Sequence, residues 1–95
     1  MEEELYTEAY YRKVGICENK GKITKHFKGD VYLIIDIAEH TETGEKMVVY
    51  KALYGNCDLY VRPLDMFAEE CTEEQFKKYG QKYRFEKVTV ESVNK

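Results

Sequence analysis

The centre of the chain carries the hydrophobic pattern of β-strands. "DVYLIIDIAEH" (30–40) is rich in β-branched and aromatic residues, which favours a strand. Its apolar residues divide between the two faces in two pairs that do not share one alternation, Tyr32 with Ile34 and Ile35 with Ile37. A β-bulge or a strong bend near Asp36 would reconcile the two pairs, and bent strands of this kind are typical of small barrels.

Two more strands follow, separated by turns. "HTETGE" (40–45) predicts a hairpin loop, and "KMVVYKALY" (46–54) predicts the returning strand. "GNCD" (55–58) predicts a second tight turn before a third strand, "LYVR" (59–62). Pro63 ends that strand because it has no N–H to donate, and "PLDMF" after it predicts one helical turn.

Helical signals lie toward both ends of the chain. Apolar residues at helical spacing predict a short helix over residues 2–12, and Gly21 marks the turn that follows it. Thr72 with Gln75 resembles a capping box, which predicts a helix near 73–82.

The second of these helices is expected to bury Phe76 and Tyr79, and Gly80 is expected to weaken its last turn. "YRFEKVTV" (83–90) predicts a closing strand, and the last five residues predict a frayed tail.

These elements predict a mainly β (α+β) fold. The expected architecture is a small SH3-like, partly open barrel of about five strands with short terminal helices. We expect a single domain over 1–95, because a chain of 95 residues builds one small core. Within it, 1–20 would be an N-terminal helical extension, 21–68 the barrel core, and 69–95 the final helix and closing strand.

Composition and charge narrow the classes of function. The net charge of −3 excludes a global basic field for nucleic acid. No apolar run approaches the roughly 18 residues that a membrane helix needs, and the acidic N-terminus lacks the apolar core of a signal peptide. Three cysteines, an odd number without a C-x-x-C pair, favour free thiols over a disulfide framework or zinc site. We therefore expect a cytoplasmic protein without a metal, a cofactor or membrane contact.

Several motifs resemble a known family. They are "HFKG" (26–29), Tyr32, "AEHTETGE" (38–45), "VVYKALYG" (48–55) and "YVRPLDMF" (60–67), with "RFEKV" (84–88) similar to a closing segment. Their joint occurrence in this order resembles the small bacterial family called domain of unknown function 1653. The resemblance covers 22–68 best and implies an SH3-type barrel, but it implies no activity. The helix after residue 68 would lie outside the family core.

One departure from the family pattern concerns an aromatic ring. The family usually has Leu-Trp-Val-Arg-Pro where this chain has Leu59-Tyr60-Val61-Arg62-Pro63. A stacking surface built on that position would keep a smaller ring that carries a hydroxyl.

His26 and His40 flank the first long strand and are the two histidines of the chain. A histidine serves as a base, a ligand or a pH sensor. No Ser or Asp stands at a spacing that implies a nucleophile–base pair. His40, at the mouth of a hairpin, is more often a turn residue that bonds to the backbone, and His26 is the stronger candidate because it neighbours Lys28. Both remain candidate binding residues.

Arg62 is the strongest single candidate for a functional residue. Pro63 biases its backbone toward extended geometry at the end of a strand. Its planar guanidinium suits a carboxylate or a phosphate. The alternative is an internal contact, either an ion pair with Glu45 or Asp65 or packing on a tyrosine ring.

Tyrosine supplies nine of the thirteen aromatic rings. We expect Tyr32 and Tyr50 to be core residues whose hydroxyls reach the rim. Tyr54 and Tyr60, beside the Gly55 turn, are equally consistent with core and with an exposed binding surface.

Lysines are concentrated between residues 20 and 28, and Lys28 lies next to His26 in this stretch. The lysines could meet phosphates. A row of lysines on an edge strand also prevents edge-to-edge pairing, and we favour that interpretation because the chain is acidic overall.

The candidates combine into one hypothesis about function. We expect a small binding module whose rim recognises an anionic partner, either a peptide or an RNA. The residues of that rim are Tyr54, Tyr60, Arg62, His26 and Lys28, with His40 as a further candidate. One alternative is a small enzyme or ligand pocket that uses His26 or His40, which is less expected. Another is a structural domain, monomeric or weakly homodimeric, whose exposed rings form the dimer face.

Overall fold

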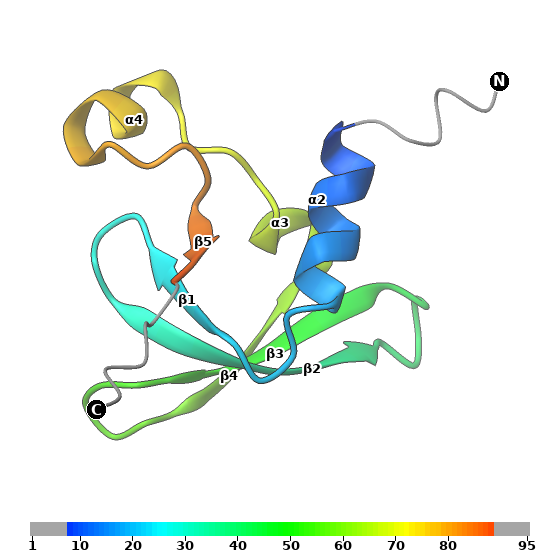
Figure 1. The fold of residues 1–95 in the computed structure, drawn as a ribbon. Coiled ribbons are helices and arrows are strands. Elements are labelled where there is room, and N and C mark those ends of the chain that lie inside the picture. The colour runs from blue at the N-terminus through cyan, green and yellow to red at the C-terminus, as the bar shows by residue number, and fades with distance from the viewer. Residues whose placement is uncertain (1–7, 89–95) are drawn as a thin grey trace, which may run out of the picture.

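A curved antiparallel sheet is the main element of the computed structural model, which describes residues 8–88 (Figure 1). Its five strands lie in the spatial order β4-β3-β2-β1-β5, and every neighbouring pair is antiparallel. Their bounds are β1 Ile23–His26, β2 Val31–Glu39, β3 Lys46–Ala52, β4 Leu59–Pro63 and β5 Phe85–Lys87. The mainly β prediction is confirmed. β4 and β5 are the two edges of this sheet, and no strand pairing within residues 8–88 joins them into a closed barrel.

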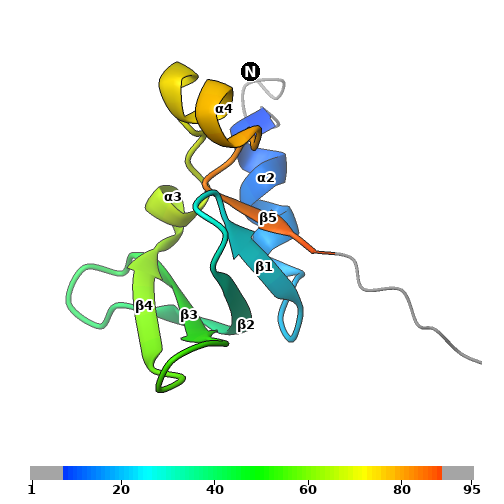
Figure 2. The ribbon, with the colours of Figure 1, turned by 90° about the vertical axis from the view of Figure 1, so that its left-hand side faces the viewer.

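Three helices in the described range lie toward one end of the sheet (Figures 1 and 2). They are α2 Glu8–Cys17, α3 Leu64–Phe67 and α4 Glu73–Tyr79. The helix predicted over 2–12 therefore continues to Cys17, and its first six predicted residues lie outside the described range. The single turn predicted after Pro63 is confirmed as α3.

The predicted β-bulge is present in β2. Ile34 lies opposite Tyr50, but the next paired residue, Asp36, lies opposite Val49, so Ile35 is the extra residue. Ile35 is 41% exposed, whereas Ile34 is buried and Ile37 packs against the core. The bulge thus explains how apolar residues three apart in one strand face the same core.

The core fills the concave side of the sheet and is closed by helices. The ring of Phe67 from α3 stacks on the ring of Phe85 from β5, with centroids 4.1 Å apart and planes 6° from parallel. Ile16 of α2 packs into the same cluster. The full set of buried core residues is Ile16, Ile34, Val48, Tyr50, Leu64, Phe67 and Phe85. β5 therefore belongs to the core. Of the closing strand predicted over 83–90, Phe85–Lys87 pair with β1 and Tyr83 forms an isolated bridge with Glu70, whereas residues 89 and 90, like the predicted frayed tail, lie outside the described range.

The capping box that begins α4 is confirmed. The Gln75 backbone N–H donates to Thr72 Oγ1 at 3.1 Å, and the Thr72 N–H donates to Gln75 Oε1 at 2.9 Å. Gly80 caps the other end in the left-handed conformation, with φ 78°, so it terminates the helix instead of weakening its last turn.

The expectation that α4 buries two rings is wrong. Phe76 is 51% exposed and Tyr79 is 39% exposed, and none of the helix's residues is buried. The helix extends away from the sheet (Figure 2), and of its two rings Tyr79 contacts Phe27 edge-on, with centroids 5.2 Å apart, but stays partly exposed.

The lysine-rich stretch does not lie on an edge strand. β1 pairs with β2 on one side and with β5 on the other. The interpretation of its lysines as protection of a sheet edge is therefore wrong, because the edges are β4 and β5.

Two expectations drawn from composition can be compared with the structure. Cys17, Cys57 and Cys71, the three cysteines of the chain, are all free. Among residues 8–88, no helix is long and apolar enough to cross a membrane.

Candidate binding site

Four tyrosines from three adjacent strands and the turn after β3 form one cluster, the tyrosine cluster of Tyr32, Tyr50, Tyr54 and Tyr60. Tyr32 is its centre, with its ring 5.2 Å from that of Tyr50, 5.7 Å from Tyr54 and 6.5 Å from Tyr60, all in edge-on geometry. Tyr50 is a core residue at 5% exposure, as the sequence predicts. Tyr54 and Tyr60 are 43% and 42% exposed, so they present ring surface to a ligand.

The hydroxyls of Tyr32 and Tyr54 are hydrogen-bonded to each other at 2.9 Å. Burial, and then this hydrogen bond, raise the pKa of Tyr32 well above its ordinary value. Partial desolvation also raises the pKa of Tyr60, with a smaller contribution from the negative charge of Asp58. Tyr32 and Tyr60 are therefore neutral at physiological pH, and the cluster offers ring faces and hydroxyls.

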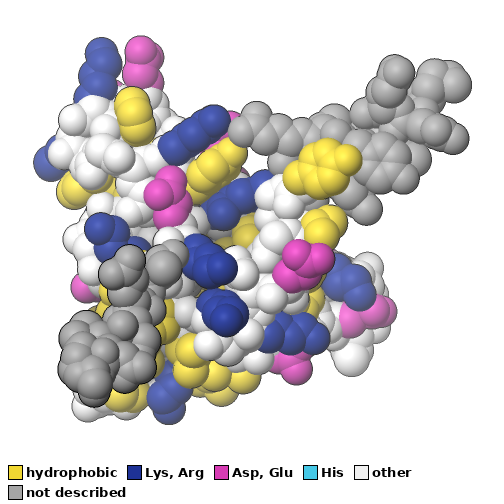
Figure 3. Space-filling view, in the orientation of Figure 1, with side chains coloured by type: hydrophobic (Ala, Val, Ile, Leu, Met, Phe, Trp, Pro, Cys, Tyr) yellow, Lys and Arg dark blue, Asp and Glu magenta, His cyan; other side chains and the backbone are white. Residues whose placement is uncertain are grey.

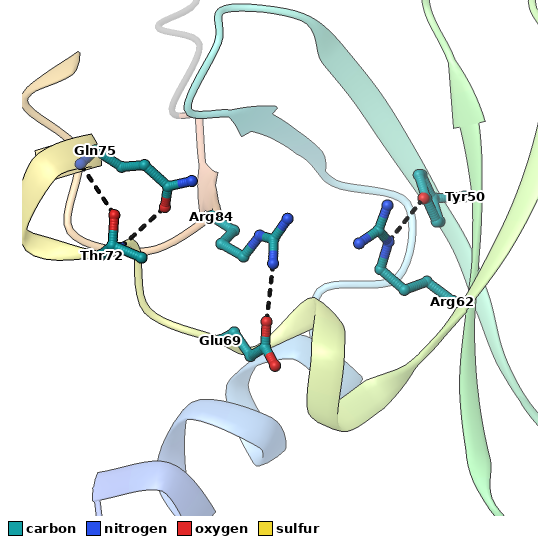
Figure 4. Close-up of polar contacts among 6 residues, drawn as sticks. All are labelled: Tyr50, Arg62, Glu69, Thr72, Gln75 and Arg84. Atoms are coloured by element: carbon teal, nitrogen blue, oxygen red, sulfur yellow. Dashed lines mark hydrogen bonds and ion pairs between the residues drawn. The ribbon is translucent and has the colours of Figure 1, made fainter. Parts of the chain in front are cut away.

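Arg62 enters this cluster from β4. Its Nε donates to the hydroxyl of Tyr50 at 3.2 Å (Figure 4). Its guanidinium carbon lies 5.6 Å from the centroid of the Phe85 ring. Within the described residues it forms no ion pair with an acidic side chain, and Asp65 pairs instead with Lys13 at 2.5 Å. The expected ion pair with Glu45 or Asp65 is thus not found there. The expected packing on a ring is present, but the ring is that of Phe85.

His26 lies at the end of β1 next to the same ring. Its imidazole centroid is 5.0 Å from that of Phe85, and its Nδ1 accepts a hydrogen bond from the Lys28 backbone N–H at 3.2 Å. Burial lowers the pKa of His26, and the positive charges of Arg84, Arg62 and Lys28 lower it further, in that order. His26, Lys28 and Arg62 therefore do lie in one electrostatic environment.

Arg84 is a residue of this environment that the sequence analysis did not single out. It immediately precedes β5, and its Nη1 donates to Glu69 Oε1 at 2.9 Å (Figure 4). Its Nε is buried without a hydrogen-bond partner in the described part of the chain. The sequence signal for Arg84 was its place in the "RFEKV" motif, directly before Phe85. A charged residue next to a buried aromatic residue at a strand end is held in a defined position, which makes it a candidate for binding.

His40 lies elsewhere. It begins the loop between β2 and β3, where its Nδ1 accepts from the Glu42 backbone N–H at 3.2 Å. The turn that carries Tyr54 is at the opposite end of the β2–β3 ribbon (Figure 1). The structure does not bring the two histidines together, so it offers no geometry for a site that uses both.

The surface charge is mixed. The face drawn in Figure 3 carries Lys and Arg beside Asp and Glu, with hydrophobic side chains between them. Among residues 8–88, no group of three or more His, Cys, Asp and Glu side chains is placed to hold a metal ion. The available chemistry is therefore local, consisting of exposed tyrosine rings beside a small group of cations.

Comparisons with known proteins agree with this fold. The model of the family described as protein of unknown function (DUF1653) matches residues 22–87. The chain is also similar to the crystal structure of a DUF1653 protein from Bordetella bronchiseptica, with a TM-score of 0.61 and 29% identity over 79% of this chain and 94% of that one. No match was found among curated proteins. The matched residues include α4, so the expectation that this helix falls outside the family core is wrong.

Proposed function

The chain belongs to the DUF1653 family, and from that premise we propose that it is a small binding module that recognises an anionic group of a partner. The family description assigns no activity, so the proposal is argued from the residues of the site. The proposed binding residues are Tyr54, Tyr60, Arg62, His26 and Lys28, the exposed or half-buried side chains around Tyr32 and Phe85.

One observation carries the proposal. Arg62 is half-buried and oriented by Tyr50, yet no acidic side chain of residues 8–88 neutralises it. A partly desolvated guanidinium without a counter-charge favours an anion more strongly than an exposed one does. The exposed rings of Tyr54 and Tyr60 supply apolar contact beside it.

We also propose that the curved sheet is an SH3-type barrel that is open between β4 and β5. The contacts of Phe85 support this, because its ring on one edge strand reaches Tyr50 at 5.8 Å and Arg62 of the other edge strand. Two edge strands can share such contacts only when the sheet is strongly curved. The three free thiols agree with the proposed cytoplasmic location.

An NMR titration of the full chain tests the binding proposal. A short oligouridylate and short acidic peptides are the probes, and backbone amide shifts are the measurement. We expect shifts that cluster at Tyr54, Tyr60 and Arg62 and that decrease in Arg62→Met. Lys46→Met is the matched control, because it removes an exposed cation that pairs with Glu39 and is not among the charges that act on His26. A lack of clustered shifts with every probe would reject the proposal.

Self-association is a second candidate function. Leu59 and Val61 on the edge strand β4 are 61% and 57% exposed, and exposed apolar residues on an unpaired strand favour pairing with another chain. Light scattering after size-exclusion chromatography tests it. A monomer at high concentration would reject this candidate.

A further inference from the structure

One arginine lies on each side of the space between the two edge strands, which we call the seam. Arg62 belongs to β4, and Arg84 immediately precedes β5. Figure 4 shows both guanidinium groups turned toward the same space, Arg62 beside Tyr50 and Arg84 beside Glu69. The charges of both arginines act on His26, which places them in one region.

The hydrogen-bonding capacity of the two arginines is not used up by the described residues. A guanidinium has five N–H donors. Arg62 donates from Nε to the neutral hydroxyl of Tyr50, and Arg84 donates from Nη1 to Glu69. Because the buried Nε of Arg84 has no partner in the described range, that donor carries an unrepaid desolvation cost. The two arginines therefore have N–H donors that the described residues leave unused. Within those residues their one acidic partner is Glu69, so one positive charge is left without a counter-charge.

We propose that Arg62 and Arg84 together hold a single carboxylate group of a peptide partner across the seam between β4 and β5. This inference rests on the proposed function and names the partner of the same site. The planar guanidinium matches a carboxylate through two parallel N–H···O bonds, so two arginines can satisfy both carboxylate oxygens. The rest of the peptide would lie against the exposed rings of Tyr54 and Tyr60.

The charges around the seam favour a peptide over a nucleic acid. Asp30 and Asp58 are close enough to act on the titration of His26 and Tyr60. A nucleic acid carries a charge on every phosphate and gains affinity from many cations along its path. Beside these acidic residues a polyanion meets repulsion along its path, whereas a peptide with one carboxylate needs only the two arginines to balance its one charge.

A titration with matched peptide pools tests the inference. The pools are N-acetylated pentapeptides of mixed neutral sequence, the first with a free C-terminal carboxylate, the second amidated with one Glu, and the third amidated with Gln in its place. The measurement is the NMR shift of the arginine Nε–Hε signals together with the dissociation constant. We expect binding of the first or second pool, which distinguishes a terminal from a side-chain carboxylate, and at least tenfold weaker binding of the third. If neither the first nor the second pool bound more tightly than the third, the inference would be overturned.

Substitutions assign the effect to the arginines. Arg62→Met and Arg84→Met should each weaken carboxylate binding tenfold or more, whereas Lys46→Met should not change it. Because Arg84→Met also removes the contact with Glu69 and can reduce stability, Glu69→Gln is the decisive variant. It removes the internal competitor of Arg84, so we expect roughly threefold tighter binding. Unchanged or weaker binding in Glu69→Gln would contradict a role for Arg84 in the site.

Oligouridylate and inorganic phosphate complete the titration. Shifts at the tyrosine cluster with oligouridylate but none with any peptide pool would overturn the inference and leave the proposed function standing. A lack of shifts with peptides, oligouridylate and phosphate alike would overturn both.

Discussion

The guanidinium of Arg62 lies over the ring of Phe85, with its central carbon 5.6 Å from the ring centroid. This contact joins side chains of the two edge strands, which are not hydrogen-bonded to each other. Cation–π contacts of this kind contribute about 0.5–2 kcal/mol, depending on how far they are desolvated. At this point the two edge strands are therefore joined by side chains and not by strand pairing.

The hydroxyl of Tyr50 should be needed to orient Arg62. In Tyr50→Phe the ring stays in the core but the hydrogen bond from Arg62 Nε is lost, at a cost of about 1 kcal/mol in the free energy of unfolding. Urea unfolding measures that cost, and the NMR exchange rate of the Arg62 Nε–H should increase. Tyr32→Phe, which removes only the bond to Tyr54, is the control and should leave that exchange rate unchanged.

Phe85 should be essential for stability, whereas Phe76 should not. Phe85→Ala removes a ring stacked on Phe67 and should cost about 4 kcal/mol, and Phe85→Leu, which keeps most of the volume, about 1–2 kcal/mol. Phe76→Ala on α4 should change the free energy of unfolding by less than about 0.5 kcal/mol, because half of the side chain is exposed. Thermal and urea unfolding compare the three variants. A large loss in Phe76→Ala would mean that α4 packs against a surface in solution.

Two glycine substitutions should act in opposite directions. Gly80 has φ 78° with open space around its missing Cβ, so Gly80→Ala should cost about 1 kcal/mol through backbone strain alone. Gly15 lies inside α2 with nothing within 4 Å of a Cβ, so Gly15→Ala should stabilise the protein by up to about 1 kcal/mol. Urea unfolding gives both values. Equal effects of the two substitutions would contradict this assignment of α4's end.

His26 should titrate below its ordinary pKa of 6.5, because burial and three neighbouring cations oppose its protonation. The unfolded chain then binds more protons than the folded one as the pH falls from about 6.5 through the folded-state pKa. The free energy of unfolding should therefore decrease on acidification through that window and level off below it. NMR titration of the imidazole checks the direction. Lys28→Gln should raise the His26 pKa, whereas Lys46→Gln should leave it unchanged.

A bound anion should reverse the depression of the His26 pKa. Negative charge in the seam offsets the fields of Arg62 and Arg84, so an acidic peptide should raise the pKa of His26 and its amidated Gln counterpart should not. If the two peptides gave the same titration curve, the bound carboxylate would not lie near His26.

Much of the fold could be predicted from local sequence. Three features were predicted correctly: the bulge at Ile35, the capping box of Thr72 and Gln75, and the helical turn after Pro63. Each depends on the conformations and side chains of a few neighbouring residues. Family membership could be predicted for the same reason, because each of the family's motifs lies on a single strand or turn. Alternation along β3 also predicted that Tyr50 is buried. The position of Arg62 next to Pro63 predicted that it is a candidate binding residue.

Contacts between segments distant in the sequence could not be predicted in this way. The place of β1 inside the sheet, the exposure of α4 and the contact of Arg62 with Phe85 depend on how strongly the sheet curves. Curvature sums small twists over all five strands, and no local pattern encodes that sum. The chain thus specified its elements and its candidate residues locally. The environment shared by His26, Lys28, Arg62 and Arg84 exists only because the two edge strands face each other across a shared core.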